Sequence, residues 1–167
     1  MTRYLSQVIA TLYRPSENDV QRAFALSRAA AERLPSLPWV AIISITSPER
    51  PPAELGGFVH VLRLSFADVD FMSSALSPRG RAKLNHAFTI EQAQAIRHFV
   101  ETLPGSVTSV VVHCEGGYSR SCAIALALHR LYGYEVEMER LTQANPSVLQ
   151  LMMRDTFPAR QRRGGRA

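Results

Sequence analysis

The sequence predicts an α/β domain in which helices cover a mainly parallel sheet of four or five strands. Two short apolar runs, WVAIISI at 39–45 and SVVVH at 109–113, have the length and the β-branched content of strands buried on both faces. Longer segments with helical patterns lie before, between and after these runs. Strands that alternate with helices are typical of layered folds built around a parallel sheet.

At the N-terminus the pattern predicts a strand followed by a helix. Leu5 to Leu12 form the first apolar run and are expected to be a strand. From Ser16 the order S-E-N-D has the form of a capping box, and an alanine-rich stretch follows to about Arg33. This combination predicts a helix between the first strand and the one at 39–45.

A loop, a strand and a second loop are expected next. Residues 47–57 contain three prolines and two glycines, which are typical of a loop. The segment FVHVLRLSF at 58–66 combines alternation with β-branched residues and predicts a strand. Residues 67–88 are broken by Pro78 and Gly80 and are expected to form a long loop, and loops of that length are often functional.

An amphipathic helix is expected to begin after Thr89, where T-I-E-Q forms a second capping box. Apolar residues then recur at helical spacing, which indicates a helix packed on a sheet. They are Ala93, Ile96, Phe99, Val100 and Leu103. Pro104 and Gly105 end this helix, and the strand at 109–113 follows.

The C-terminal part predicts three helices. The first runs from Ser119 or Arg120 to about Tyr132 and is apolar on nearly every side, which indicates a central, buried helix. Gly133 stands where helices commonly end. Two shorter helices are expected, one at 135–143 and one capped by Asn145 with Pro146 at its first position.

The chain has 167 residues, of which 46% are hydrophobic and 20% charged, a composition typical of one globular domain. We expect a single domain over residues 1–157 and a basic, flexible tail over 158–167. No secretory signal and no apolar run of membrane-spanning length is recognised, and two cysteines are too few for a disulfide framework. A cytoplasmic protein without a membrane partner is therefore expected. Apart from the arginines near the C-terminus the charge is nearly balanced, so nucleic acid is not an expected partner.

The sequence HCEGGYSRS at 113–121 joins a predicted strand to a predicted helix. Gly116 and Gly117 allow the backbone to turn its amide groups inward, and the helix start adds further N–H groups. A loop of this kind binds an anion, and Arg120 would add a planar, permanently charged group suited to phosphate. In the same field Cys114 is expected to ionise readily and to act as a nucleophile. We prefer this interpretation to that of a small hydrophobic residue packed at a strand end.

HCEGGYSRS resembles the His-Cys-x5-Arg-Ser signature of the protein tyrosine phosphatase superfamily. It is especially similar to the dual-specificity group and to short bacterial proteins predicted to be tyrosine phosphatases. The resemblance implies a three-layer phosphatase-like fold and a hydrolase that forms a cysteinyl-phosphate on Cys114. It implies no metal and no cofactor. The implied substrate is a phosphorylated protein or peptide, with phosphotyrosine first and phosphoserine or phosphothreonine next, and phosphate, sulfate or vanadate would occupy the loop.

The resemblance also assigns roles to the neighbours of Cys114. Arg120 is implied to clamp the phosphate, Ser121 to stabilise the departing thiolate, and His113 to order the loop through hydrogen bonds. The remaining loop residues are implied to bind phosphate, mainly through their amide groups. They are Glu115, Gly116, Gly117, Tyr118 and Ser119.

The general acid is implied to be an aspartate just beyond the strand at 58–66. Asp68 matches this position best, and Asp70 is the alternative. Asp68 precedes Cys114 by more residues than is usual in the dual-specificity group, so an insertion within 71–88 is assumed. Arg79, Arg81 and Lys83 in this segment are either recognition charges beside the cleft or part of a solvated loop.

Two other functions remain open. Rhodanese-like sulfurtransferases also use a Cys-x5-Arg loop, although they need no aspartic acid. A phospho-residue binding module would keep the anion-binding loop and lack turnover. The histidine before the cysteine and the serine after the arginine favour the phosphatase over the sulfurtransferase.

Overall fold

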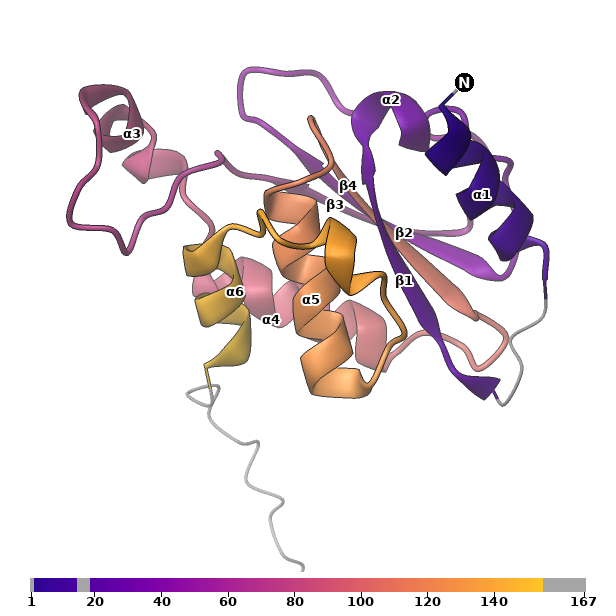
Figure 1. The fold of residues 1–167 in the computed structure, drawn as a ribbon. Helices are drawn as coiled ribbons and strands as arrows, with labels where there is room; N and C mark the ends of the chain where they lie inside the picture. Colours follow the sequence, from indigo (N-terminus) through magenta and orange to yellow (C-terminus); the bar gives the residue numbers. More distant parts are fainter. Residues whose placement is uncertain (1, 15–18, 155–167) are drawn as a thin grey trace, which may run out of the picture.

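A sheet of four parallel strands lies at the centre of the molecule (Figure 1). The computed structural model describes residues 2–14 and 19–154. The strands are β1 (Arg22–Ser27), β2 (Val40–Thr46), β3 (His60–Ser65) and β4 (Ser109–Cys114), in the spatial order β1-β4-β2-β3. The predicted α/β class and the predicted parallel sheet of four or five strands are thus confirmed, with four strands.

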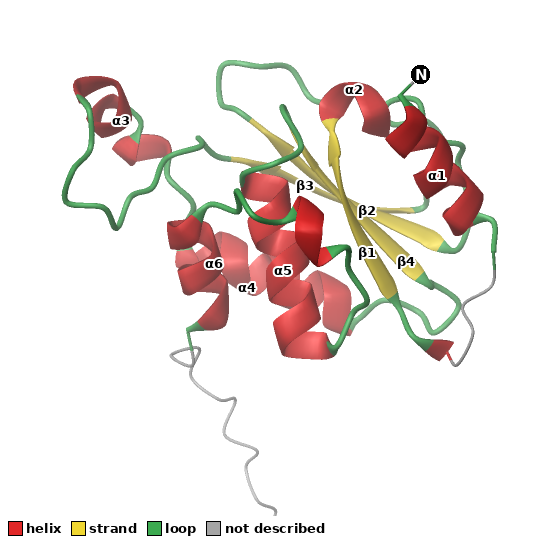
Figure 2. Cartoon of the chain, in the orientation of Figure 1, coloured by secondary structure: helices red, strands yellow, loops and turns green. Residues whose placement is uncertain are grey.

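Helices cover both faces of this sheet, which gives the three expected layers (Figures 1 and 2). One face carries α1 (Arg3–Leu12) and the short α2 (Arg28–Ala31). The opposite face carries α4 (Ile90–Glu101), α5 (Arg120–Tyr132) and α6 (Pro146–Met153). None of the helices in the described part of the chain is both long and apolar enough to cross a membrane.

Alternation along the central strands supplies two hydrophobic cores. Ala41, Ile43 and Ile45 of β2 belong to the core shared with α4, α5 and α6. Val40 and Ile42 belong to the core shared with α1. Because successive side chains of a strand point to opposite faces, a wholly apolar strand such as β2 requires cover on both sides.

The N-terminal segment is a helix, so the predicted strand at 5–12 is wrong. Leu5, Val8 and Leu12 are buried at positions that recur every three or four residues, which places them on one face of α1. The side chain of Thr2 accepts a hydrogen bond from the amide of Leu5 and so caps the helix start.

The alanine-rich stretch is mainly a strand, so the helix predicted to run to about Arg33 is also wrong. The predicted start of that helix at Ser16 lies outside the described residues. Phe24 and Leu26 of β1 face the α1 side, whereas Ala23 and Ala25 face the α5 side. Pairing with β4 overrides the helix propensity of alanine, and only α2, capped by Ser27, is helical here.

The expected strands at 39–45, 58–66 and 109–113 correspond to β2, β3 and β4, and the helix expected after Thr89 is α4. The Thr89 capping box is present, with Gln92 as its partner. The expected loop at 67–88 contains two short helical segments, α3 (Pro78–Ala82) and a 3₁₀ turn at Leu84–His86.

In the C-terminal part the central helix α5 ends at Gly133, which has a φ of 73°. The helix expected at 135–143 is wrong, because only a 3₁₀ turn at Met138–Arg140 forms there. Glu135 instead forms a parallel bridge with Arg22 at the edge of the sheet. The last predicted helix is α6, with Asn145 as its cap and Pro146 in its first turn. The predicted division between a domain to residue 157 and a tail from 158 lies outside the described residues.

Candidate active site

The loop between β4 and α5 holds the predicted nucleophile at the carboxyl edge of the sheet. Cys114 is the last residue of β4 and is buried, and Arg120 is the first residue of α5. Ser119 stands at the cap position of α5, yet its side chain makes no cap hydrogen bond. The first N–H groups of α5 are therefore not satisfied by a cap and remain near the loop.

The Cys114 thiol is surrounded by groups that can stabilise a negative charge on sulfur. Its Sγ lies 3.1 Å from Oγ of Ser121 and accepts a hydrogen bond of 3.3 Å from the amide of Gly117. No hydrogen bond from the amides of Gly116, Tyr118 or Ser119 to another described residue is found. These amides are available to an anion bound in front of the sulfur.

Gly117 is required by the backbone of this loop. It has a φ of +84°, and a Cβ built on it would lie 2.4 Å from the amide nitrogen of Ser27 and 2.6 Å from the carbonyl carbon of Leu26. The loop thus presses against the end of β1, and this contact turns the Gly117 amide toward Cys114. The predicted role of this glycine in aiming an amide has a geometric basis here.

Arg120 is buried under the loop, with 4% of its surface exposed. Its Nη1 donates to Oγ of Ser47 at 3.1 Å and to the carbonyl of Phe66 at 2.8 Å. Its Nε is buried and has no hydrogen-bond partner among the described residues. The described residues therefore hold the guanidinium by Nη1 and make no hydrogen bond to its Nε–Nη2 edge, which is the edge that binds an oxyanion in a two-pronged manner.

Asp68 is oriented toward the loop. Its Oδ1 accepts hydrogen bonds from the Ser119 hydroxyl and from Nδ2 of Asn145, both at 2.9 Å. Asp70, the alternative acid, accepts a hydrogen bond from the hydroxyl of Ser147 at the start of α6. Asp68 lines the pocket described below, whereas Asp70 does not.

His113 lies on the opposite side of β4 from Cys114 and is fully buried. Its Nδ1 lies 3.3 Å from the carbonyl oxygen of Cys114, and its Nε2 lies 2.6 Å from Oγ of Ser44 on β2. Burial lowers the pKa of His113, and the charge of Arg28 lowers it further, so the ring is neutral near pH 7. Because a carbonyl can only accept, we assign the proton to Nδ1, and Nε2 accepts from Ser44.

A pocket of about 410 Å³ opens above this loop. Its lining comes from the loop after β2, the segment after β3, the segment around α3, and the loop between β4 and α5. The residues are Ser47, Pro48, Glu49, Ala67, Asp68, Ala82, Lys83, His86, Glu115 and Arg120. Of the three basic residues considered for recognition, Lys83 lines the pocket and Arg79 and Arg81 do not.

The other two side chains of the predicted phosphate-binding set lie away from the sulfur. The carboxylate of Glu115 forms ion pairs with Arg28 at 3.3 Å and with Arg50 at 3.8 Å. The ring of Tyr118 lies over Gly116, with 58% of the residue exposed, and does not line the pocket. Only the backbone of these two residues can contribute to anion binding in this arrangement.

Four residues of the site were missed by the sequence reasoning. Ser44 is hydrogen-bonded to His113, and Ser47 is hydrogen-bonded to Arg120. Asn145 is hydrogen-bonded to Asp68, and Arg28 is hydrogen-bonded to Glu115. For Asn145 the only signal was that of a helix cap, and the other three carry no signal because their partners are distant in the sequence. Within residues 2–14 and 19–154, no group of three or more His, Cys, Asp or Glu residues is placed to hold a metal ion.

Comparison with known proteins shows no match to any family model and no significant match to any curated protein.

Proposed function

We propose that the protein is a cysteine-dependent phosphatase that hydrolyses phosphotyrosine in proteins or peptides. One observation carries the proposal: a buried thiol that accepts a hydrogen bond from a loop amide lies in the same loop as a buried arginine whose Nε has no partner among the described residues, and this arginine and Asp68 line one pocket. A phosphate with an ester oxygen directed toward Asp68 is complementary to this arrangement. The resemblance to the tyrosine phosphatase superfamily supports the same proposal.

In the first step the thiolate of Cys114 attacks phosphorus, and the bond between phosphorus and the ester oxygen breaks. The leaving oxygen takes a proton from Asp68. Both hydrogen bonds to this carboxyl group go to Oδ1, which leaves Oδ2 to carry the proton. The loop amides and Arg120 stabilise the equatorial phosphate oxygens, on which negative charge is held in the transition state.

In the second step water attacks the cysteinyl-phosphate, and Asp68, now ionised, accepts a proton from that water. The phosphorus–sulfur bond breaks, inorganic phosphate leaves, and the electron pair of the bond returns to sulfur. The Ser121 hydroxyl and the Gly117 amide lie next to Sγ and stabilise the thiolate as it departs.

The depth of the nucleophile supports phosphotyrosine as the substrate. Cys114 is only 2% exposed and is not among the residues that line the pocket, so a phosphate has to reach past residues of the loop after β2 and of the segment around α3 to contact the sulfur. A phosphate at the end of a phenol ring reaches further into such a pocket than a phosphate on a serine side chain. We propose phosphoserine and phosphothreonine as poorer substrates for this reason.

We further propose a cytoplasmic location. The mechanism requires a reduced thiol, and both Cys114 and Cys122 are free. A reducing compartment keeps such thiols available.

The test is turnover of p-nitrophenyl phosphate and of a phosphotyrosine peptide by the wild type, Cys114→Ser and Asp68→Asn. We expect Cys114→Ser to be inactive and Asp68→Asn to lose about 10²-fold in turnover, as is usual for removal of a general acid. Vanadate should inhibit the wild type. Substantial hydrolysis by Cys114→Ser would refute the mechanism.

The same samples distinguish the alternatives. A sulfurtransferase would transfer sulfur from thiosulfate to cyanide and would not hydrolyse the peptide. A binding module would retain the phosphotyrosine peptide without turnover, and its Cys114→Ser variant would bind as well as the wild type.

A further inference from the structure

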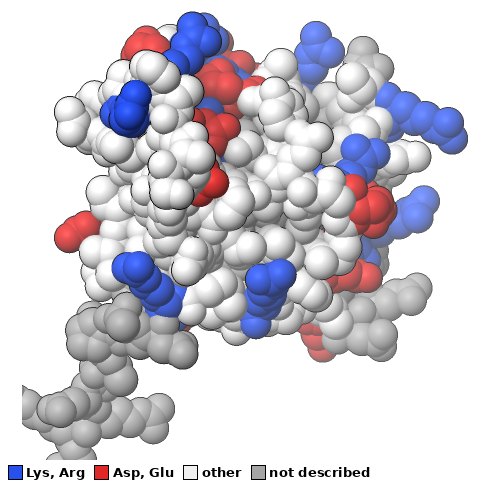
Figure 3. Space-filling view, turned by 60° about the vertical axis from the view of Figure 1, so that its left-hand side comes forward, with Lys and Arg blue, Asp and Glu red and all other residues white. Residues whose placement is uncertain are grey.

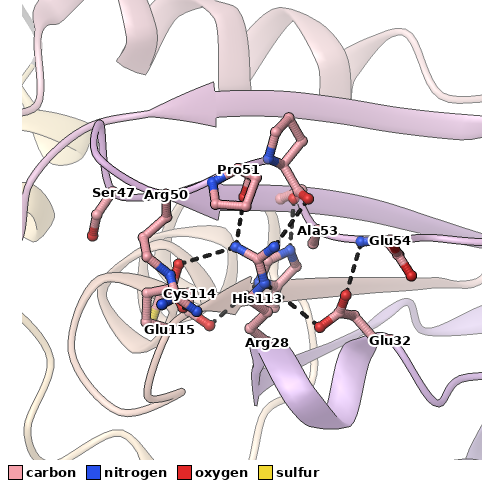
Figure 4. Close-up of polar contacts among 12 residues, drawn as sticks. Arg28, Glu32, Ser47, Arg50, Pro51, Ala53, Glu54, His113, Cys114 and Glu115 are labelled. Atoms are coloured by element: carbon pink, nitrogen blue, oxygen red, sulfur yellow. Dashed lines mark hydrogen bonds and ion pairs between the residues drawn. The ribbon is translucent and has the colours of Figure 1, made fainter.

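Arg28 is a charged residue that lies outside the catalytic loop but contacts both the loop and the pocket wall (Figure 4). It follows β1 as the first residue of α2, and only 12% of its side chain is exposed. Its Nη1 and Nη2 donate to the carbonyls of Pro51 and Pro52 at 2.6 and 2.9 Å. Nη1 also lies 3.3 Å from Glu115, the residue after the nucleophile.

The first consequence of these contacts is a fixed pocket wall. Ser47, Pro48 and Glu49 line the pocket, and the two carbonyls that Arg28 holds belong to the continuation of the same loop. Ser47 at the other end of this wall is held by Arg120. The wall is thus fixed at one end by the proposed phosphate clamp and at the other by Arg28.

A lysine could not replace these contacts. A guanidinium is planar and can direct several N–H groups at two neighbouring carbonyls and a carboxylate at once, whereas an ammonium group on a flexible stem cannot match this geometry. Glu32, which lies 3.5 Å from Nε of Arg28, also accepts a hydrogen bond from the amide of Glu54 and so holds the same loop further along.

The second consequence is that Arg28 neutralises a carboxylate at the pocket. Glu115 lines the pocket one residue after Cys114, and its side chain is 27% exposed. Its other partner, Arg50, is 55% exposed and lies at a longer distance, 3.8 Å. Without Arg28 this carboxylate would repel a phosphate dianion, because like charges at short range in a partly buried site are only weakly screened.

We propose that Arg28 is a positioning residue that determines the affinity of the site for phosphorylated substrates, by fixing the wall at 47–52 and by neutralising Glu115. This proposal rests on the phosphatase function proposed above and adds to it a residue outside the signature. Arg28 touches neither the substrate nor the reacting atoms, so its effect is on binding rather than on the chemical step.

The test uses Arg28→Met, with Arg33→Met as the matched control. Arg33 is an exposed arginine just after α2, outside the contacts described here. For Arg28→Met we expect the KM for a phosphotyrosine peptide to rise about tenfold or more, the range associated with lost hydrogen bonds to a charged group. The value of kcat should stay within about threefold of the wild-type value, since the contacts of Arg28 are the same in the substrate complex and in the transition state. Arg33→Met should match the wild type.

Glu115→Gln separates the two contributions. In the double variant Arg28→Met/Glu115→Gln the repelling charge is gone, so the Kd of vanadate, a small anion, should return close to its wild-type value. The KM of the peptide should recover only in part, because the wall remains unfixed. Recovery of neither constant would refute the role assigned to Glu115.

Two outcomes overturn the proposal as a whole. A lower melting temperature and a smaller active fraction, with KM and the vanadate Kd unchanged, would show that Arg28 serves folding alone. A loss in kcat with KM unchanged would place its effect on chemistry. If the wild type hydrolyses no phosphoester, the proposed function fails, and the Kd of inorganic phosphate for the wild type and Arg28→Met then tests the binding role by itself.

Discussion

Asn145 is a buried residue whose side chain, together with the hydroxyl of Ser119, orients Asp68. Its Nδ2 donates to Asp68 at 2.9 Å and to the carbonyl of Val69 at 3.1 Å. Its Oδ1 accepts hydrogen bonds from the amides of Ser147 and Val148 and so caps α6. Its own amide donates to the carbonyl of Ser119 in the loop between β4 and α5. Asn145 therefore joins the aspartate segment, α6 and the loop.

We predict that Asn145→Asp lowers kcat for a phosphotyrosine peptide by about tenfold or more. The substitution keeps the helix cap but replaces the donor with a second carboxylate oxygen, which repels Asp68. The loss should be smaller with p-nitrophenyl phosphate, because its leaving group needs less help from an acid. Asp68→Asn should show the same dependence on the leaving group.

Ser147→Ala is the control for this prediction, since Ser147 binds Asp70 rather than Asp68. Its turnover should be close to that of the wild type for both substrates. A large loss in Ser147→Ala and in Asp70→Asn, with normal turnover in Asp68→Asn, would transfer the acid role to Asp70.

At the scale of helices and strands, the sequence predicted an element correctly where its local residue pattern agrees with the way the element is buried in the fold. The apolar runs of β2 and β4, the capping box of α4 and the Asn-Pro start of α6 each carry a signal that tertiary packing does not contradict. The N-terminal segment failed because a short apolar run fits a strand and a helix equally well. In β1 the alanines form a strand only because β4 lies beside them.

The candidate site, too, was predictable from the sequence only in part. The proposed nucleophile, the loop and the arginine form one continuous stretch, so the sequence alone places them together. Ser44 and Asn145 act on residues that are 69 and 77 positions away. No local pattern records such contacts, and they become visible only when the strands and α6 are placed.

The contact of the loop between β4 and α5 with β1 leads to a prediction for Gly117. In Gly117→Ala the new methyl group would collide with the backbone of Ser27 and Leu26, so the loop must shift and the amide would leave Sγ. We expect a loss of about 10²-fold in kcat/KM, by analogy with the removal of one oxyanion donor. The measurement is steady-state turnover of the phosphotyrosine peptide.

Gly133→Ala provides the matched control for this prediction. Gly133 also has a positive φ, +73°, but a Cβ there meets nothing within 4 Å. This variant should lose about 1 kcal/mol of unfolding free energy from backbone strain and keep its turnover. Equal turnover losses in both variants would mean that strain, and not the displaced amide, inactivates Gly117→Ala.

For the molecule as a whole, a neutral histidine at the centre of the sheet couples stability to pH. His113 is buried between the two layers of helices and has its pKa lowered, first by burial. The unfolded chain, with an ordinary histidine pKa of about 6.5, takes up a proton before the folded chain does. Its contribution to stability is therefore complete above about pH 6.5 and is lost as the pH falls below that value.

We predict that the unfolding free energy of the wild type falls more steeply between pH 7 and pH 5 than that of His113→Asn. The difference in slope should be at most about 1.4 kcal/mol per pH unit, the value for a single proton. Urea unfolding at each pH measures it. His98→Gln, which changes an exposed histidine of α4, should keep the wild-type slope. Equal slopes in the wild type and in His113→Asn would show that His113 does not contribute to the acid sensitivity.

The parallel sheet brings the carboxyl ends of all four strands to one edge, and each loop there has its own attachment. The loop after β2 is bound tightly by Arg28 and Arg120. In contrast, α3 has no buried residue, and its segment is held mainly where it begins and ends, at Asp70 and at His86. Insertions and substitutions within residues 73–85 should therefore cost little folding free energy, and because Ala82 and Lys83 of this segment line the pocket, such changes would alter which ligands the pocket admits.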